Sequence, residues 1–498
     1  MAERDPQIGI EAARGFDAEL RKKTSRSIGW TIVRQISDQL FSLIVFVMLA
    51  RLLSKEAVGI FAMAYVFAEV GRIIATGGLM QIIARVQVVD ARLKDTIFWS
   101  NMAIAIVYVA LVWIAAPWIA GWIEQPGLVD PLRALAFVLP INALGGTHMA
   151  LRLREFGHKT IALRSLVAGL IGGGAAVAAA FAGAGIWALV IQRALTETIS
   201  TVLAWTSYRW MPGRAFSWKQ ARHNLGFGGN LTIAQLIFLM MVRVQDLLIG
   251  ANLGAAAVGT YRVAWRSNEI FANGAIQPFA SVGLQTYSRL QHDADGLCQA
   301  YRSMLGMCSA ISFPALVGFG VLAPEVVPLV FGAKWAQAGQ LAQVFAVIAV
   351  PYTLNYFASP LLTAMGNSRR QRTLAVVQLL ATILLTWLAL PFGLMAVAIA
   401  YVARSYLTLP LQIRFLTQST PIRLRDTVAA VRAPFIASST MGALLWGGLA
   451  MVQTHGWIAI AAAIPLGGLF YFAALALLSP FHRQLAMKLL TRKRLVQS

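Results

Sequence analysis

The chain has 498 residues, of which 58% are hydrophobic and only 12% are charged. A soluble protein of this length needs far more charge to cover its surface, so the composition indicates a membrane protein. The formal net charge of +22 would suit nucleic-acid binding, but the basic residues gather in short segments between long apolar runs, which argues against that function. The two cysteines, Cys298 and Cys308, predict neither a disulfide framework nor a metal site.

Long runs of Leu, Ala, Ile and Val recur from residue 27 to residue 480, each close to the roughly 20 residues that an α-helix needs to cross a bilayer. A membrane barrel would show short alternating strands, so we expect an all-α polytopic membrane protein. The first run is too long for a signal peptide and should remain as a span. The fourteen predicted spans are 27–51, 57–83, 96–120, 130–151, 161–182, 185–207, 226–251, 256–286, 300–323, 338–365, 372–391, 394–416, 429–453 and 457–479.

Lys and Arg alternate along the connections between these spans. They are frequent in the N-terminal segment 1–26, in every second connection after it and in the C-terminal segment 481–498, whereas the other connections hold few, such as Lys55, Arg133 and Lys334. Basic residues mark the cytoplasmic side, so both termini are predicted to be cytoplasmic, in the cytoplasmic (inner) membrane. No connection is long enough for a soluble domain, so any chemistry must occur within the membrane or at its edges.

The chain contains an internal repeat with an offset of about 200 residues. Each copy holds six spans, and an even number gives both copies the same orientation, as in transporters built from two parallel bundles. The two bundles are predicted at 27–222 and 223–420, followed by two additional spans within 421–480. The matching pairs are 57–64 (AVGIFAMA) with 257–264 (AVGTYRVA), Gln35 with Gln235, Glu69 with Glu269, and 185–190 with 393–398.

Ionisable side chains occur inside particular spans, although each costs about 2.5 kcal/mol or more at the bilayer centre. They follow helical spacing in the first, second, seventh and eighth spans, which occupy equivalent places in the two repeats. The pattern predicts one central water-filled cavity between the bundles. Its candidate residues are Arg34, Arg72, Arg243, Arg262 and Arg266 for an anionic headgroup, and Asp38, Glu69, Asp246 and Glu269 for ion coupling or ion pairs.

Two interpretations of these charges remain open. Arg262 has no obvious partner except Glu269, which Arg266 also requires, and such an excess of arginine suits an anion, because a guanidinium fork binds two phosphate oxygens at once. The alternative is that ion pairs within a span hold the helices together. The pairs that this alternative requires are Arg34 with Asp38, Arg72 with Glu69, Arg243 with Asp246, Arg266 with Glu269 and, in the sixth span, Arg193 with Glu197.

Six short motifs occur in an order and at a spacing typical of one family, over about residues 25–480. On these motifs the chain resembles the Wzx-type flippases for O-antigen and exopolysaccharide repeat units (lipopolysaccharide biosynthesis), within the multidrug/oligosaccharidyl-lipid/polysaccharide exporter superfamily. The motifs are 50–53 (ARLL), 57–61 (AVGIF), 77–81 (GGLMQ), 246–254 (DLLIGANLG), 257–261 (AVGTY) and 330–335 (VFGAKW).

The resemblance implies a V-shaped pair of six-helix bundles that alternates access around a central cationic cavity. The cargo would be an undecaprenyl-pyrophosphate-linked oligosaccharide, moved from the cytoplasmic to the periplasmic leaflet for surface polysaccharide or lipopolysaccharide biosynthesis, and the two extra spans would help to house its lipid tail. In the related peptidoglycan lipid flippases, arginines of the second and eighth spans face the cavity; Arg72 and Arg266 match them, whereas Arg34 lies earlier than the arginines of their first span.

The same resemblance implies a transporter rather than an enzyme, with no cofactor and no metal. Its partners would be the lipid-linked oligosaccharide, membrane lipids and a polysaccharide polymerase with its export machinery. The sequence has no Walker-type loop, so we expect no direct ATP hydrolysis.

Three other functions are alternatives to the flippase. A drug or cation antiporter of the same superfamily would use Asp38, but it needs only twelve spans and its cargo is often cationic, which the arginines disfavour. A membrane glycosyltransferase or polymerase usually has a large extracytoplasmic loop or a carboxylate-rich loop motif, and this sequence has neither. A scaffold that transports nothing would tolerate neutral replacements of the cavity charges.

Overall fold

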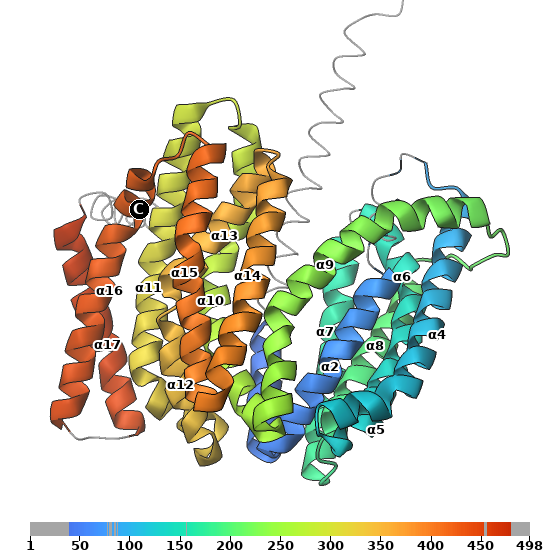
Figure 1. Ribbon diagram of the computed structural model, residues 1–498, viewed down its shortest axis with the longest axis horizontal. Helices are drawn as coiled ribbons and strands as arrows, with labels where there is room; N and C mark the ends of the chain where they lie inside the picture. The colour runs from blue at the N-terminus through green and yellow to red at the C-terminus, as the bar shows by residue number, and fades with distance from the viewer. Residues whose placement is uncertain are drawn as a thin grey trace, which may run out of the picture. The chain divides into compact units, whose positions relative to one another are not determined.

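The computed structural model describes residues 39–76, 78, 82–83, 86, 88–155, 157–452 and 456–479. Throughout these ranges the chain forms α-helices with a few short 3-10 turns and contains no strand, so the predicted all-α fold is confirmed (Figure 1). Two candidate residues of the first predicted span, Arg34 and Asp38, lie outside the described residues, as do both terminal segments.

Ten helices within the described residues are long and apolar enough to cross a membrane, and a bent pair, Ala333–Ala346 with Ala349–Ala364, makes an eleventh if it counts as one span. The three remaining predicted spans also correspond to helices. Only Gln39–Leu52 of the first is described, while α8 (Trp187–Ser207) and α10 (Ala255–Arg289) have 21 and 35 residues but are more polar. The chain is therefore a multi-pass membrane protein, and the count of fourteen stays a prediction.

The chain divides into two compact units, residues 1–239 and 240–498, and the division falls inside the long helix α9 (Trp218–Leu253). The bundle boundaries expected at residues 222 and 420 stay a prediction. Besides part of α9, the described helices of the first unit include α2 (Lys55–Thr76), α4 (Ala91–Trp122), the 3-10 turn η1 (Pro126–Leu128), α5 (Val129–Ala136), α6 (Val138–Arg154), α7 (His158–Phe181) and α8.

The second unit follows the same order of elements and then adds two helices. A long helix, a second long helix, a 3-10 turn, a broken helix and two further helices succeed one another in both units. This order confirms two pseudo-symmetric bundles with two extra C-terminal helices. After α10, the elements are α11 (Ala294–Phe331), η2 (Ala333–Trp335), α12 (Ala336–Ala346), α13 (Ala349–Ala364), α14 (Ser368–Ala389), η3 (Leu390–Phe392), α15 (Leu394–Ser419), α16 (Leu424–Val452) and α17 (Trp457–Leu478).

The break in the fourth helix recurs in both units. In the first unit α5 ends before Phe137, and in the second α12 ends before Val347, where the chain bends by 59° before α13. Pro140 and Pro351 each lie at the third position of the helix that follows the break. Proline is tolerated there because the first turn of a helix has no internal acceptor for its backbone N–H groups.

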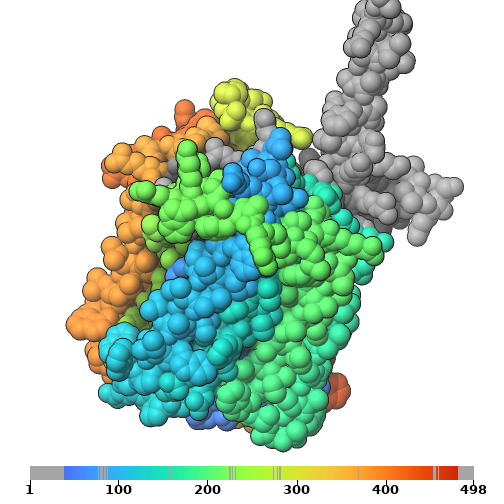
Figure 2. All heavy atoms as spheres, turned by 90° about the vertical axis from the view of Figure 1, so that its right-hand side faces the viewer, coloured from blue at the N-terminus to red at the C-terminus, as the bar shows by residue number. Residues whose placement is uncertain are grey.

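The connection between α8 and α9, residues 208–217, is bound to the beginning of α4. The buried carboxylate of Asp95 accepts hydrogen bonds from the backbone N–H groups of Gly213 at 2.9 Å and Ala215 at 3.1 Å, and the indole of Trp99 donates to the Gly213 carbonyl at 2.9 Å. Figure 2 looks onto this unit, where the green residues of the connection meet the blue beginning of α4. The segment that leads into α9 is thereby held on the first unit.

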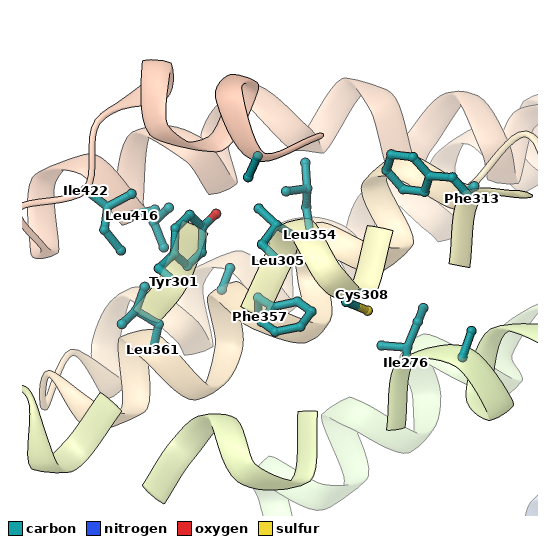
Figure 3. Close-up of a cluster of buried hydrophobic side chains, with 14 of the residues drawn as sticks. Ile276, Tyr301, Leu305, Cys308, Phe313, Leu354, Phe357, Leu361, Leu416 and Ile422 are labelled. Carbon is teal, nitrogen blue, oxygen red and sulfur yellow. The ribbon is translucent and has the colours of Figure 1, made fainter. Parts of the chain in front are cut away.

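The core of the second unit is built around α11. Figure 3 shows its buried side chains, where Tyr301 and Cys308 lie among aliphatic residues from several helices. The Tyr301 hydroxyl is 3.2 Å from the Thr427 hydroxyl, which joins α11 to α16, and α17 packs against α16 through a second apolar cluster that includes Tyr471. The outer faces stay apolar, as with Leu477, which is 87% exposed, and such faces suit a lipid environment.

Candidate functional site

In the first unit, polar side chains of α2 meet polar side chains of α6 and α8. Tyr65, Glu69 and Arg72 recur at intervals of four and three residues, so they share one face of α2. All three line a small pocket whose other polar residues are Asn142 on α6, and Arg193 and Glu197 on α8. The two α2 residues predicted for the site, Glu69 and Arg72, are thus placed together.

A chain of polar contacts crosses this pocket. The Glu197 carboxylate accepts a hydrogen bond from the Asn142 amide at 2.8 Å and forms an ion pair with Arg193 at 2.6 Å. The Arg193 guanidinium lies over the Tyr65 ring, 5.2 Å from its centroid, and is within electrostatic reach of Glu69. The predicted Arg193–Glu197 ion pair is therefore confirmed, and it also orders the pocket that contains Glu69 and Arg72.

In the second unit, α9 and α10 form a tight antiparallel hairpin around Gly254. The backbone of Gly254 has φ of +82°, a conformation that glycine adopts at no steric cost. Asp246 lies eight residues before this turn and Arg262 eight residues after it, and the two side chains form an ion pair in which Asp246 is only 1% exposed. The expectation that Arg262 has no private partner was wrong, because only partners within one helix were weighed.

Farther along α10, the predicted pair of Arg266 with Glu269 is confirmed. The two side chains are 2.8 Å apart and retain 24% and 31% of their exposure, so they are less buried than Arg262 and Asp246. Arg243, the other predicted arginine of this unit, is half-buried on α9, three residues before Asp246. The second unit thus pairs Asp246 with Arg262 and Arg266 with Glu269, and a shared site for these residues stays a prediction.

Arg404 on α15 is a buried arginine that the sequence analysis did not single out. Its side chain is buried, and its guanidinium stacks on the ring of Tyr401 at 4.5 Å from the centroid. Within the described part of the chain, Nε of Arg404 has no hydrogen-bond partner. Tyr401 in turn contacts Trp265 of α10 at 5.1 Å between ring centroids. The polarity of Arg404 in a predicted span was the signal that could have found it.

The contact between the second and sixth helices of a bundle recurs with different chemistry in the two units. With the repeat offset of 200 residues, Tyr65 corresponds to Trp265, and with the offset of 208 residues in the second echo, Arg193 corresponds to Tyr401. The first unit therefore places a guanidinium on an aromatic ring where the second unit places two rings edge to face. The first unit is charged at this position and the second is aromatic.

Tyrosines of α13 extend the aromatic side of the second unit. The hydroxyl groups of Tyr352 and Tyr356 are 3.3 Å apart, and Gln277 of α10 donates to the Tyr356 hydroxyl at 3.4 Å. Trp265 also contacts Tyr352, with ring centroids 6.3 Å apart. This group combines aromatic rings with hydroxyl groups. A single cavity lined by both units stays a prediction.

Comparison with known proteins finds a family and relatives that are named for polysaccharide biosynthesis. The sequence model of a family described as "Polysaccharide biosynthesis protein" matches residues 48–340. The teichuronic acid biosynthesis protein TuaB of Bacillus subtilis is 23% identical over 411 residues, which cover 81% of this chain and 84% of TuaB. The lipopolysaccharide biosynthesis protein WzxC of Escherichia coli is 22% identical over 66% of this chain and 68% of its own length.

A third relative matches over a smaller share of its length. The succinoglycan biosynthesis transport protein ExoT of Rhizobium meliloti is 22% identical over 317 residues, and the match spans 64% of each chain. Among solved structures, the lipid II flippase MurJ in an inward closed conformation is similar with a TM-score of 0.74 at 14% identity, over 92% of this chain and all of MurJ. An inward-facing multidrug MATE transporter is similar with a TM-score of 0.63 at 15% identity, over 76% of this chain and 94% of the transporter chain.

Proposed function

Because the chain belongs to the family of polysaccharide biosynthesis proteins, we propose that it is a flippase that moves a lipid-linked oligosaccharide repeat unit across the cytoplasmic membrane by alternating access. The observation that carries the proposal is the family match over residues 48–340, on a chain whose fold is similar to a lipid flippase over 92% of its length. The carrier lipid we propose is undecaprenyl pyrophosphate, and the product serves surface polysaccharide or lipopolysaccharide biosynthesis.

The chemistry of such a cargo requires a polar path. A pyrophosphate and several sugars cannot cross hydrocarbon unaided, since each unsatisfied polar group costs several kcal/mol there. The half-exposed arginines Arg72 and Arg266 are the residues we propose for the pyrophosphate, because a guanidinium can bind two phosphate oxygens at once. Arg262 is only 14% exposed and is bound to Asp246, so it is better suited to holding α10 against α9.

The Arg266–Glu269 pair suggests how binding can be coupled to an ion. A phosphate that takes Arg266 competes with Glu269 for the same guanidinium. Glu269 would then lose its partner, and its carboxylate would be available to a coupling cation. In the first unit Glu69 lies within reach of Arg193 in the same way. One charge moved across the membrane yields about 2.3 kcal/mol per 100 mV, enough to bias a transport cycle.

A drug or cation antiporter is the second candidate function. The similarity of the fold to an inward-facing MATE transporter supports it. The arginines that line the pocket of the first unit, Arg72 and Arg193, disfavour a cationic cargo. An antiporter would confer resistance to cationic compounds and leave surface polysaccharide unchanged, so the two functions predict different phenotypes.

Complementation tests the flippase directly. In a strain that lacks its own polysaccharide flippase and carries a matched sugar pathway, we expect the native chain to restore surface polysaccharide. Arg72→Ala and Arg266→Ala should each abolish that restoration, because the cargo phosphate loses a cation. The measurement is the amount of surface polysaccharide at equal membrane abundance of each protein.

Arg92→Ala and Arg289→Ala are the matched controls. Both arginines are exposed, and Arg289 lies on the same helix as Arg266, so each control removes the same charge outside the proposed site. The controls should restore polysaccharide like the native chain. If Arg72→Ala and Arg266→Ala restore it equally well, these arginines are structural and the proposed cargo site is wrong.

A further inference from the structure

A cavity of about 790 Å³ lies in the second unit where the beginnings of α11 and α16 meet the end of α17. None of the polar residues of α9 and α10 described above lines it, so it is separate from the proposed cargo site. The polar part of its wall comes from α11 and from the turn that leads into α16. The ionisable residues of the wall are Asp295, Cys298, Arg302, Arg423, Arg425 and Asp426.

The charge of this cavity is positive overall, with three arginines and two aspartates. Asp426 already accepts a hydrogen bond from the Arg423 backbone N–H at 2.8 Å, and it lies 4.0 Å from the guanidinium of Arg302. The Arg302 side chain is 54% exposed, and Arg423 and Arg425 are exposed as well. Three guanidinium groups can therefore turn toward an anion without first breaking a buried pair, and phosphate is the anion that their fork fits best.

The remaining wall of the cavity is apolar and has small side chains. Ala429, Ala430 and Ala433 of α16 and Gly306 of α11 line it. One turn farther along the same face of α16, Ile436 is a large apolar side chain that is 47% exposed. A basic end beside an apolar helix face matches a molecule with a phosphate at one end and hydrocarbon at the other.

We propose that this cavity binds an anionic phospholipid, with its phosphate held by Arg302, Arg423 and Arg425 and its acyl chains along the alanine face of α16. Basic pockets between membrane helices bind anionic lipid headgroups in this way. Ser479, at the end of α17, also lines the cavity. The site does not depend on what the protein transports.

Cys298 provides a native reporter of occupancy. It lines the cavity and is half-buried, whereas the other cysteine, Cys308, is fully buried in the core. The experiment measures the rate at which N-ethylmaleimide modifies Cys298, by mass spectrometry, in nanodiscs of phosphatidylcholine alone and of phosphatidylcholine with phosphatidylglycerol. Native protein should react several-fold more slowly when phosphatidylglycerol is present, because the lipid covers the thiol.

The triple variant Arg302→Gln, Arg423→Gln, Arg425→Gln should react at nearly the same rate in the two lipids. The matched control removes three exposed arginines elsewhere in the second unit, Arg289→Gln, Arg369→Gln and Arg372→Gln, and should keep the native ratio of rates. Equal ratios in all three proteins would mean that surface charge alone slows the reaction, and the site would be refuted.

Two further arms complete the test. Inorganic phosphate is added to native protein in phosphatidylcholine, and protection as strong as that by phosphatidylglycerol would show that the ligand is a free anion, which overturns the lipid assignment. If the triple variant does not fold, Arg425→Gln alone replaces it, since this exposed side chain forms no ion pair with a described residue. It should lose part of the protection, and unchanged protection would contradict the proposal.

Discussion

The ion pair between Asp246 and Arg262 shows what decides the role of a charged residue in this protein. Both side chains are withdrawn from solvent, and they come from different helices that a turn at Gly254 places side by side. A buried carboxylate with a cation contributes to the packing of two helices, whereas the partly exposed pair of Arg266 and Glu269 can exchange partners. Arg262 and Arg266 are the same residue type on the same helix. The deeper burial of Arg262 is the reason that we assign it a structural role and Arg266 a binding role.

We expect Asp246→Asn and Arg262→Gln each to lower the free energy of unfolding by about 3–5 kcal/mol, because each change breaks a buried ion pair by removing one of its two partners. The double variant should lose much less than the sum of the two, since it removes both charges. Thermal unfolding of the purified protein in detergent measures the effect. Additive losses would show that the two side chains do not interact.

At the scale of elements, glycines set the distance between α7 and α8. A Cβ atom on Gly172 would lie 2.1 Å from the Thr196 hydroxyl and 3.0 Å from the Gln192 carbonyl oxygen, both on α8. Gly174, two residues later on α7, has no such neighbour among the described atoms within 4 Å. Small residues permit membrane helices to pack closely, and these distances show that Gly172 does so against α8.

Gly172→Ala should therefore destabilise the protein by about 1–3 kcal/mol, the usual effect of overpacking. Gly174→Ala is the matched control, because it adds the same methyl group to the same helix in open space, and it should leave stability nearly unchanged. The measurement is the midpoint of thermal unfolding of the two variants. Equal midpoints would contradict the contact between α7 and α8.

Much of the fold could be predicted from sequence because membrane helices are marked by length and hydropathy. The repeat was also visible in the sequence, and it extends to details such as Pro140 and Pro351 after the break in the fourth helix. Pairs within one helix, such as Arg266 with Glu269, follow from spacing alone. Spacing along one helix could not predict the partner of Arg262, because Asp246 comes from a different helix. It also could not predict the stacking of Arg404 on Tyr401, because that depends on how the two side chains are oriented.

At the scale of the whole molecule, two units share one plan and differ in chemistry. The pocket of the first unit is charged, with Arg193 on the Tyr65 ring, and the corresponding position of the second unit is aromatic, with Trp265 against Tyr401. A cargo that carries both a pyrophosphate and sugars presents two chemistries as well. We therefore expect the charged and aromatic sides to contribute differently to transport.

Substitution of the aromatic side tests this expectation. Tyr352→Phe removes a hydroxyl and keeps the ring, so it should weaken transport of a sugar cargo by less than Tyr352→Ala, which removes both. Tyr406→Phe is the control, since Tyr406 lies on α15 and its hydroxyl bonds the Val347 carbonyl at 2.7 Å, apart from the described aromatic group. The measurement is the amount of surface polysaccharide in the complementation strain. Equal activity of the two Tyr352 variants would show that the Tyr352 ring does not contribute to transport of the sugar cargo.

The most direct test of the central claim uses purified protein in vesicles. Lipid-linked oligosaccharide extracted from the cells that make the protein is labelled on its sugar with a fluorophore and placed in both leaflets, and an impermeant quencher is added outside. We predict that vesicles with the native chain lose fluorescence beyond the outer-leaflet fraction, and that vesicles with Arg72→Ala and Arg266→Ala stop at that fraction, as empty vesicles do. If the fluorescence of vesicles with the native chain also falls only by the outer-leaflet fraction, the protein does not flip this cargo.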